Sequence, residues 1–70
     1  MMFTPMQINE VKHMLIGRNT DMVLESQQDG NGMDFDVKVD GDHLVVTLFR
    51  NTPCGKRELV DSMDVQPLVG

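Results

Sequence analysis

The stretch MDFDVKVDGDHLVVTLF, residues 33–49, decides the fold that the sequence predicts. Apolar and charged side chains alternate over its first eight positions, with the apolar ones at Met33, Phe35, Val37 and Val39. A period of two is typical of a strand with one buried face. A second such run follows at about His43 to Arg50, with Leu44, Val46 and Leu48 on one side. Two alternating runs so close together predict an antiparallel hairpin.

The turn of this hairpin decides which side chains share a face. A two-residue turn with glycine second, Asp40-Gly41, fits the twist of paired strands. An even loop sets apolar residues opposite one another, with Val37 facing Leu44, Phe35 facing Val46 and Met33 facing Leu48. We therefore expect one apolar face that packs on a helix and one acidic face that looks outward.

The N-terminal segment predicts a helix from about Pro5 to Ile16. Thr4 and Gln7 can exchange hydrogen bonds as a capping box, and proline suits the first helical position. The apolar residues then recur on one stripe, at Ile8, Val11 and Leu15. An amphipathic helix of this kind is expected to cover the apolar face of the sheet.

Two further segments complete the predicted fold. The run DMVLESQ, apolar at Met22 to Leu24 and followed by the turn-rich QQDGNG, predicts a first strand. Thr52-Pro53 repeats the Thr-Pro helix start and predicts a short helix from about Pro53 to Met63. Residues 65–70 are expected to form a frayed or extended tail, because Pro67 cannot continue a helix. The prediction is a single α+β domain over residues 1–70, in the order α-β-β-β-α with a three-stranded, mostly antiparallel sheet.

The composition sets limits on the class of protein. A chain of 70 residues forms one domain, with net stability of about 3–5 kcal/mol unless a partner adds to it. A single cysteine excludes an internal disulfide, and no apolar run approaches the ~18 residues that span a bilayer. We expect a cytoplasmic protein without a membrane partner. Seven methionines and no tryptophan or tyrosine predict a core filled by flexible thioether side chains.

The acids around Gly41 do not match a calcium loop. Such a loop needs oxygen ligands at its odd positions and a glutamate at position twelve. Counted from Asp36, the third position is Lys38 and the twelfth is Thr47. His13, His43 and Cys54 form none of the compact pairs of a metal site. We expect neither a metal nor another cofactor.

Cys54, in TPCGK, is the most suggestive residue for catalysis. A thiol at a helix start with Lys56 and Arg57 nearby has a lowered pKa, and the thiolate is the nucleophile. Nothing in the sequence places His13 or His43 beside it as a base. The prediction is a protein that is not an enzyme, with a thiol-dependent activity as the lesser alternative.

Charge argues against nucleic acid as the partner. Between Asp21 and Asp42 lie seven acids and one base, and this acidic middle repels phosphate. Arg50, Lys56 and Arg57 could make three phosphate contacts, which would support only weak, salt-sensitive binding.

The outward face of the hairpin carries the functional prediction. Val45 and Phe49 project there among acids, and large apolar groups rimmed by charge are typical of a contact patch. We expect a non-enzymatic protein-binding module, a regulator or inhibitor that docks on a basic surface of another protein. In this hypothesis four acids steer the encounter and two apolar residues anchor it: Asp34, Asp36, Asp40 and Asp42, with Val45 and Phe49.

Two other interpretations of this face stay open. The C-terminal helix could fold over it and cover Val45 and Phe49 through Leu59 and Met63. Alternatively, the two residues could pair across a two-fold axis in a homodimer. The free edges of a three-stranded sheet also permit strand addition by a partner or by a second copy.

Overall fold

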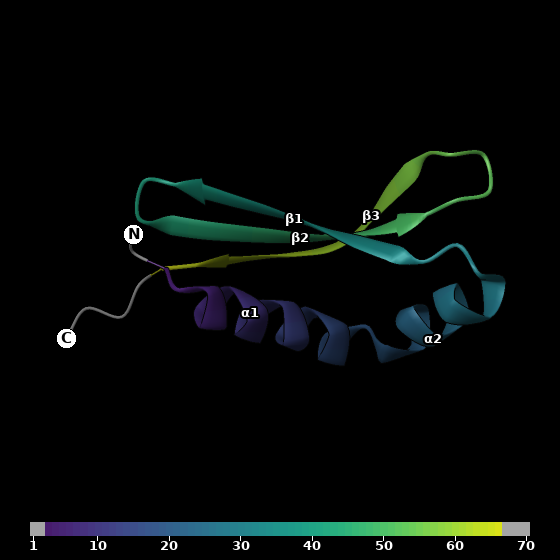
Figure 1. Ribbon diagram of the computed structural model, residues 1–70, viewed down its shortest axis with the longest axis horizontal. Helices are drawn as coiled ribbons and strands as arrows, with labels where there is room; N and C mark the ends of the chain where they lie inside the picture. Colours follow the sequence, from purple (N-terminus) through teal and green to yellow (C-terminus); the bar gives the residue numbers. More distant parts are fainter. Residues whose placement is uncertain (1–2, 67–70) are drawn as a thin grey trace.

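The computed structural model describes residues 3–66, which form two helices followed by three strands. Both helices lie on one side of an antiparallel sheet of strand order β1-β2-β3 (Figure 1). The elements are α1 (Pro5–Arg18), α2 (Thr20–Asp29), β1 (Met33–Asp40), β2 (His43–Asn51) and β3 (Arg57–Val65). The α+β class and the three-stranded antiparallel sheet are confirmed, whereas the predicted order and the C-terminal helix are wrong.

Helix α1 begins as the sequence predicts. The backbone amide of Gln7 donates to Thr4 Oγ1 at 3.2 Å, and the Thr4 amide donates to Gln7 Oε1 at 2.8 Å, which completes the capping box. The helix continues two residues beyond the predicted end at Ile16, to Arg18.

The predicted strand at Met22 to Leu24 is wrong, because these residues lie in α2. Three consecutive apolar residues do not alternate, whereas Val23 and Ser26, one helical turn apart, face inward. Gly30 ends the helix with φ +76°, a left-handed cap that glycine adopts without steric cost. The glycine-rich stretch after residue 28 is therefore a helix stop and not a strand boundary.

The hairpin has the predicted parity with a different turn. Gly41 and Asp42 form the two-residue turn, so that Asp40 pairs with His43 and Val37 pairs with Val46, not with Leu44. Gly41 occupies the first central position with φ +62°, as in a type II′ turn. Moving the turn by one residue shifts the pairing by two positions, which keeps the apolar side chains on one face.

The predicted helix from Pro53 to Met63 is also wrong, because Arg57–Val65 is a strand. Thr52 closes a turn instead of capping a helix: its amide donates to Lys56 O at 3.0 Å and its hydroxyl donates to the same oxygen at 2.7 Å. Gly55, with φ +84°, completes the turn. Val65, predicted to start a frayed tail, ends β3, and Gln66 follows it outside any helix or strand. The other residues of that predicted tail, 67–70, lie outside the described residues.

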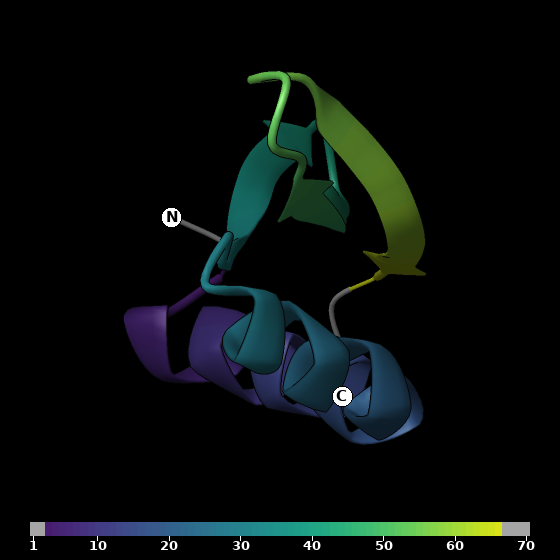
Figure 2. The same cartoon turned by 90° about the vertical axis from the view of Figure 1, so that its right-hand side faces the viewer.

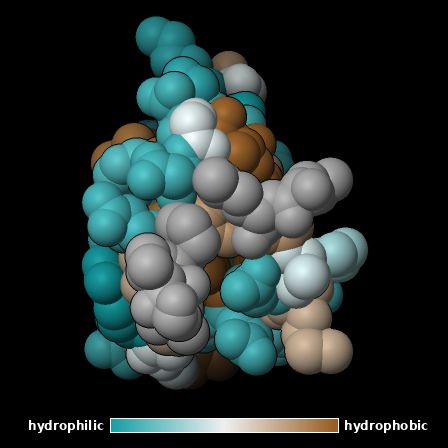
Figure 3. Space-filling view, turned by 90° about the vertical axis from the view of Figure 1, so that its left-hand side faces the viewer, coloured by the Kyte–Doolittle hydropathy of each residue, from teal (hydrophilic) through white to brown (hydrophobic). Residues whose placement is uncertain are grey.

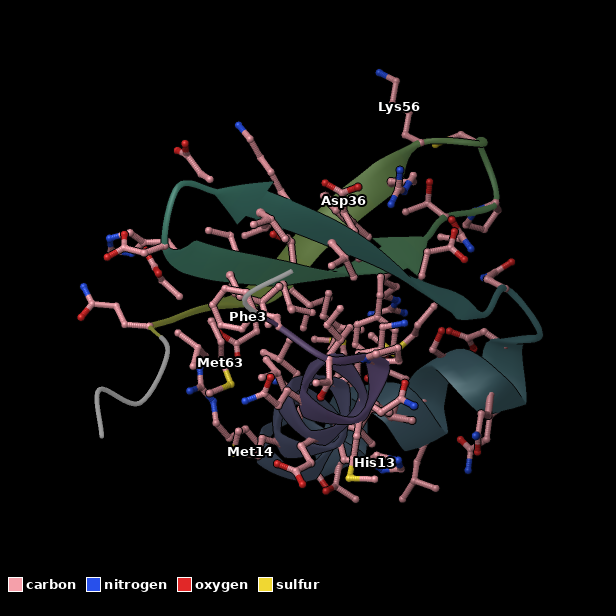
Figure 4. The ribbon with its side chains drawn as sticks, turned by 60° about the vertical axis from the view of Figure 1, so that its left-hand side comes forward. Phe3, His13, Met14, Asp36, Lys56 and Met63 are labelled. Atoms are coloured by element: carbon pink, nitrogen blue, oxygen red, sulfur yellow. The ribbon has the colours of Figure 1, made fainter. Side chains whose placement is uncertain are left out.

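The core lies where α1 covers β2 and β3. Its buried residues are Phe3, Val11, Leu15, Leu44, Val46 and Leu48. Figure 4 shows Phe3 and Met63 between the sheet and the helix. The predicted methionine core is wrong, because among the described residues Met33 and Met63 only pack at its margin, and Met6 and Met14 are exposed.

Val37 and Val39 are on the predicted side of the sheet without being buried there. They share the helix side of β1 with Met33 and Phe35, yet they are 38% and 50% exposed. The reason is that α1 packs against β2 and β3, as the end view in Figure 2 illustrates. Figure 3, which faces the end with the β1–β2 turn, shows hydrophobic residues at the surface between hydrophilic ones.

A bulge in β3 ties the sheet to the junction of the two helices. The register between β2 and β3 shifts between Leu48, which pairs with Asp61, and Phe49, which pairs with Leu59. The Asp61 side chain points to the helix side of the sheet. Its carboxylate accepts bonds from Arg18 Nη2 and Asn19 Nδ2, each at 2.8 Å. These bonds lower the pKa of the Asp61 carboxyl. The hydrogen bond from Asn19 has the largest effect, and the bond from Arg18 has the next largest.

Candidate functional site

The face of the sheet away from the helices, called the open face below, carries the predicted site. Within residues 3–66 no helix or loop lies over it (Figures 1 and 2). Strand parity and the pairing register give its members: Asp34, Asp36, Lys38 and Asp40 of β1; His43, Val45, Thr47, Phe49 and Asn51 of β2; Arg57, Leu59, Ser62 and Asp64 of β3.

The register arranges these side chains in rows across the three strands. One row is Asp34, Phe49 and Leu59; the next is Asp36, Thr47 and Ser62; the third is Lys38, Val45 and Asp64. An acid thus stands beside the aromatic ring at one end, and the middle row is polar. The structure brings the predicted Asp34, Asp36, Asp40, Val45 and Phe49 together on this face.

The apolar part of the open face has one member that sequence reasoning missed. Leu59, which one of the open alternatives placed on a helix covering this face, instead lies on the face opposite Phe49 and is 66% exposed. Met63, its predicted companion, points to the core. The signal that could have found Leu59 is Gly55, because a glycine inside the first turn of a helix is more typical of a hairpin turn.

Phe49 is partly covered by a neighbouring cation. The Arg57 guanidinium carbon lies 4.1 Å from the ring centroid, a cation–π arrangement. Phe49 and Val45 are both half-buried. The anchor predicted from the sequence is therefore smaller than two bare apolar side chains, and Leu59 is the most exposed apolar residue of the three.

The β1 acids are free to meet a partner. Asp34, Asp36 and Asp40 are exposed, and none of them forms an ion pair with any residue from 3 to 66. Figure 4 shows Asp36 on the side of the sheet away from α1. Because these carboxylates are exposed and have no ion pair, their field extends into the solvent. A cation of a partner can bind them without breaking an existing ion pair.

Asp42 lies apart from these acids, in the turn. Its carboxylate is 3.4 Å from His43 Nε2, and Asp64 is 2.8 Å from His43 Nδ1. The hydrogen bond to Asp64 is the main reason that the pKa of His43 is raised above its ordinary value of 6.5. Asp42 therefore belongs to a small histidine cluster at the end of the sheet.

The three basic residues of β2, the β2–β3 loop and β3 do not form the cluster that a phosphate site would need. Arg50 points to the helix side, where its Nη2 is 3.1 Å from Asp29 and 3.4 Å from Glu25. Arg57 stacks on Phe49 on the opposite face, and Lys56 lies in the β2–β3 loop (Figure 4). The three cations are thus directed to different sides of the sheet.

The cleft between α2 and the β2–β3 loop holds an arginine that is already paired with acids. It is lined by Asp29, Asn31, Arg50, Asn51, Thr52, Pro53 and Glu58. The pairing of Arg50 with two acids of α2 neutralises the only arginine or lysine in this lining. Among the described residues, this cleft therefore offers no unpaired arginine or lysine that could bind an anionic ligand.

Cys54 is exposed in the β2–β3 loop and not at a helix start. Its Sγ lies 3.1 Å from Thr52 Oγ1, and this hydrogen bond, followed by the Lys56 amide, lowers the pKa of the thiol. No hydrogen bond joins Cys54 to either histidine in the described chain. Residues 3–66 also contain no group of three histidine, cysteine or acidic side chains arranged to hold a metal.

Comparison with known proteins found no matching family model, no matching curated protein and no matching solved structure. Neither described helix has the length and apolar character that crossing a bilayer requires. The functional argument therefore rests on the open face itself.

Proposed function

We propose that the protein is a non-enzymatic binding module that docks its open face on a basic surface of a partner protein, as a regulator or inhibitor. One observation carries this proposal. The unpaired acids of β1 and the exposed Leu59 lie on one sheet face that no described element covers.

Charge defines the kind of partner surface. The open face carries four carboxylates, at Asp34, Asp36, Asp40 and Asp64, against Lys38 and Arg57, and His43 beside Asp64 pairs with that acid alone among the four. The whole chain has a formal charge of −5, and its field reaches about 8–10 Å in physiological salt. A basic surface is attracted and oriented by this field before contact.

Apolar contact supplies the binding energy once the surfaces meet. Leu59 and Phe49 are cross-strand neighbours, and the Arg57 side chain extends over the ring. A partner that covers this group removes Leu59 from water and can use the planar guanidinium as a hydrogen-bond donor. The acids around the group then form the polar rim.

The test compares two charge reversals of equal size. Asp34→Lys with Asp36→Lys reverses the open face, whereas Glu10→Lys with Asp21→Lys makes the same charge change on exposed helix positions. Each variant carries an affinity tag, and its folding is checked by circular dichroism. It is then used for quantitative affinity capture from a lysate of the source cell.

The proposal expects a partner retained by the wild type and by the helix variant and depleted at least tenfold with the open-face variant. Equal retention of the same proteins by all three baits would count against the proposal. So would capture that is lost only when the helix acids are reversed.

A further inference from the structure

The two edges of the sheet differ in their capacity to accept another strand. Edge strand β3 has a bulge opposite Leu48, and its Asp61 is bonded to Arg18 at the end of α1, which disrupts a regular ladder. Edge strand β1 pairs without interruption over all eight of its residues and contains neither glycine nor proline. Only β1 offers a regular edge within the described sheet.

The backbone of β1 is oriented for pairing through its apolar positions. Asn51 N–H donates to Gly32 O at 3.2 Å, which fixes the alternation of bonds between β1 and β2. The backbone N–H and C=O groups of residues 34, 36, 38 and 40 point toward β2, as those of Gly32 do. The N–H and C=O groups of Met33, Phe35, Val37 and Val39 therefore point to the free edge.

We infer that β1 pairs antiparallel with β1 of a second copy, about a two-fold axis at Val37. In this register Val37 faces its own counterpart, and Phe35 faces Val39 of the second copy on the helix side. On the open face Asp36 faces Lys38 of the second copy, and the symmetry repeats this opposite-charge pair. Cross-strand pairs of opposite charge stabilise a sheet, and like charges destabilise it.

The symmetric registers centred on the charged residues of β1 place like charges at the axis. A register centred on Val39 would set Lys38 against Asp40, but it pairs only residues 38–40 of the strand. A pairing centred on Asp36 sets that carboxylate against its copy, and one centred on Lys38 sets two ammonium groups together and Asp36 against Asp40. The register at Val37 leaves one kind of like pair, Asp34 against Asp40. This pair lies at the strand ends, where solvent screens it.

The helix layer leaves room for the second copy. Val37 and Val39 are 38% and 50% exposed on the helix side, because α1 packs over β2 and β3. Pairing of the edges covers these two valines and makes a six-stranded sheet with both open faces on the same side. An interface of one strand pair falls below the roughly 1,200 Å² of a stable complex, so the dimer is weak and concentration-dependent.

Sedimentation equilibrium tests the inference, with protein from about 10 μM to about 1 mM, the range in which interfaces of this strength associate. The wild type is expected to move from the monomer mass toward twice that mass. Asp36→Lys alone and Lys38→Asp alone each place like charges at the axis and should weaken the dimer at least tenfold. Mixing these two variants restores opposite charges at every such pair, so the mixture should dimerise again.

Two controls separate strand pairing from general charge attraction. Val37→Pro removes an N–H that points to the free edge, where proline is tolerated, and should give a folded monomer. When this proline is added to the Asp36→Lys variant, mixing with Lys38→Asp should no longer give a dimer, although the net charges are unchanged.

The register has its own test, because Asp34→Lys turns the one like pair into an opposite pair and should strengthen the dimer. A wild type that stays monomeric over the whole range overturns the inference, as does a mixture that fails to associate. Weakening by Asp34→Lys would overturn the register at Val37. The Val37→Pro monomer retains every open-face acid, so loss of dimerisation and loss of partner capture are distinguishable.

Discussion

Arg57 lies over the ring of Phe49, 4.1 Å from its centroid, on the side of the sheet that the helices leave open. The one aromatic side chain of the open face is thus held in place by a cation from the neighbouring strand. This contact stabilises the β2–β3 hairpin and presents a donor group beside the exposed Leu59.

Loss of this contact is expected to be measurable. Arg57→Ala should lower the free energy of unfolding by about 0.5–1 kcal/mol, the usual size of an exposed cation–π interaction. Lys56→Ala, one residue earlier in the loop, is the matched control and should change it little. Urea unfolding followed by circular dichroism provides the measurement, and equal effects of the two variants would argue against the contact.

The small core makes individual leucines decisive. Leu15 and Leu48 are fully buried, and truncation of either to alanine costs about 2–5 kcal/mol. The whole domain is expected to have about 3–5 kcal/mol, so Leu15→Ala should be largely unfolded at room temperature. Leu24→Ala, at a position 52% exposed on α2, should remain folded in the same thermal melt.

A buried hydroxyl links α2 to the start of the sheet. Ser26 is fully buried, and its Oγ donates to Gly32 O at 2.8 Å. Ser26→Ala should cost about 0.5–1.5 kcal/mol, since Gly32 O retains its bond from Asn51 and is not left unpaired. Ser62→Ala on the exposed face is the comparison, and a cost as large as that of Ser26→Ala would show that burial is not the cause.

The histidine cluster predicts a loss of stability as the pH rises above the ordinary histidine pKa. Because Asp64 raises the pKa of His43 in the folded state, its contribution is fully present below the ordinary value of 6.5 and is lost as the pH rises through the folded value. His43→Gln should flatten the part of the stability profile that lies above the ordinary histidine value of 6.5. His13→Gln, exposed on α1, is the matched control variant.

The clamp at the helix junction predicts the opposite dependence in acid. Asn19 and Arg18 lower the pKa of Asp61, so its contribution is present above the ordinary value of 3.8 and is lost as the pH falls through the folded value. Asp61→Asn should reduce stability at neutral pH and remove part of the acid sensitivity. An acid profile identical to that of the wild type would show that the carboxylate does not hold the junction.

The hairpin was predictable because alternation of side chains alone determines strand faces. Residues 33–40 alternate without interruption, and a shift of the turn from Asp40-Gly41 to Gly41-Asp42 leaves the faces intact. This is why the five predicted open-face residues of β1 and β2 lie together. The faces of this hairpin therefore do not depend on the type of its turn.

The wrongly predicted strand at Met22 to Leu24 and the wrongly predicted helix from Pro53 to Met63 have a common cause. Each rested on a short sequence pattern that is compatible with more than one local structure. Thr-Pro caps α1, where Thr4 bonds forward to an amide, but Thr52 bonds to the Lys56 carbonyl and closes a turn. Met22 to Leu24 carries no periodicity of its own, so its helical state depends on α1 and on the tertiary contact of Ser26. Leu59 and Arg57 were missed as site residues because their strand was predicted as a helix.

Methyl NMR of the protein with the partner isolated by affinity capture tests the proposed docking face most directly. Signals of Val45 and Leu59 on the open face are compared with those of Leu24 and Met6, which are 52% and 73% exposed on the helices. Docking through the open face predicts shifts or line broadening confined to Val45 and Leu59. Perturbation of Leu24 and Met6, with Val45 and Leu59 unchanged, would contradict it.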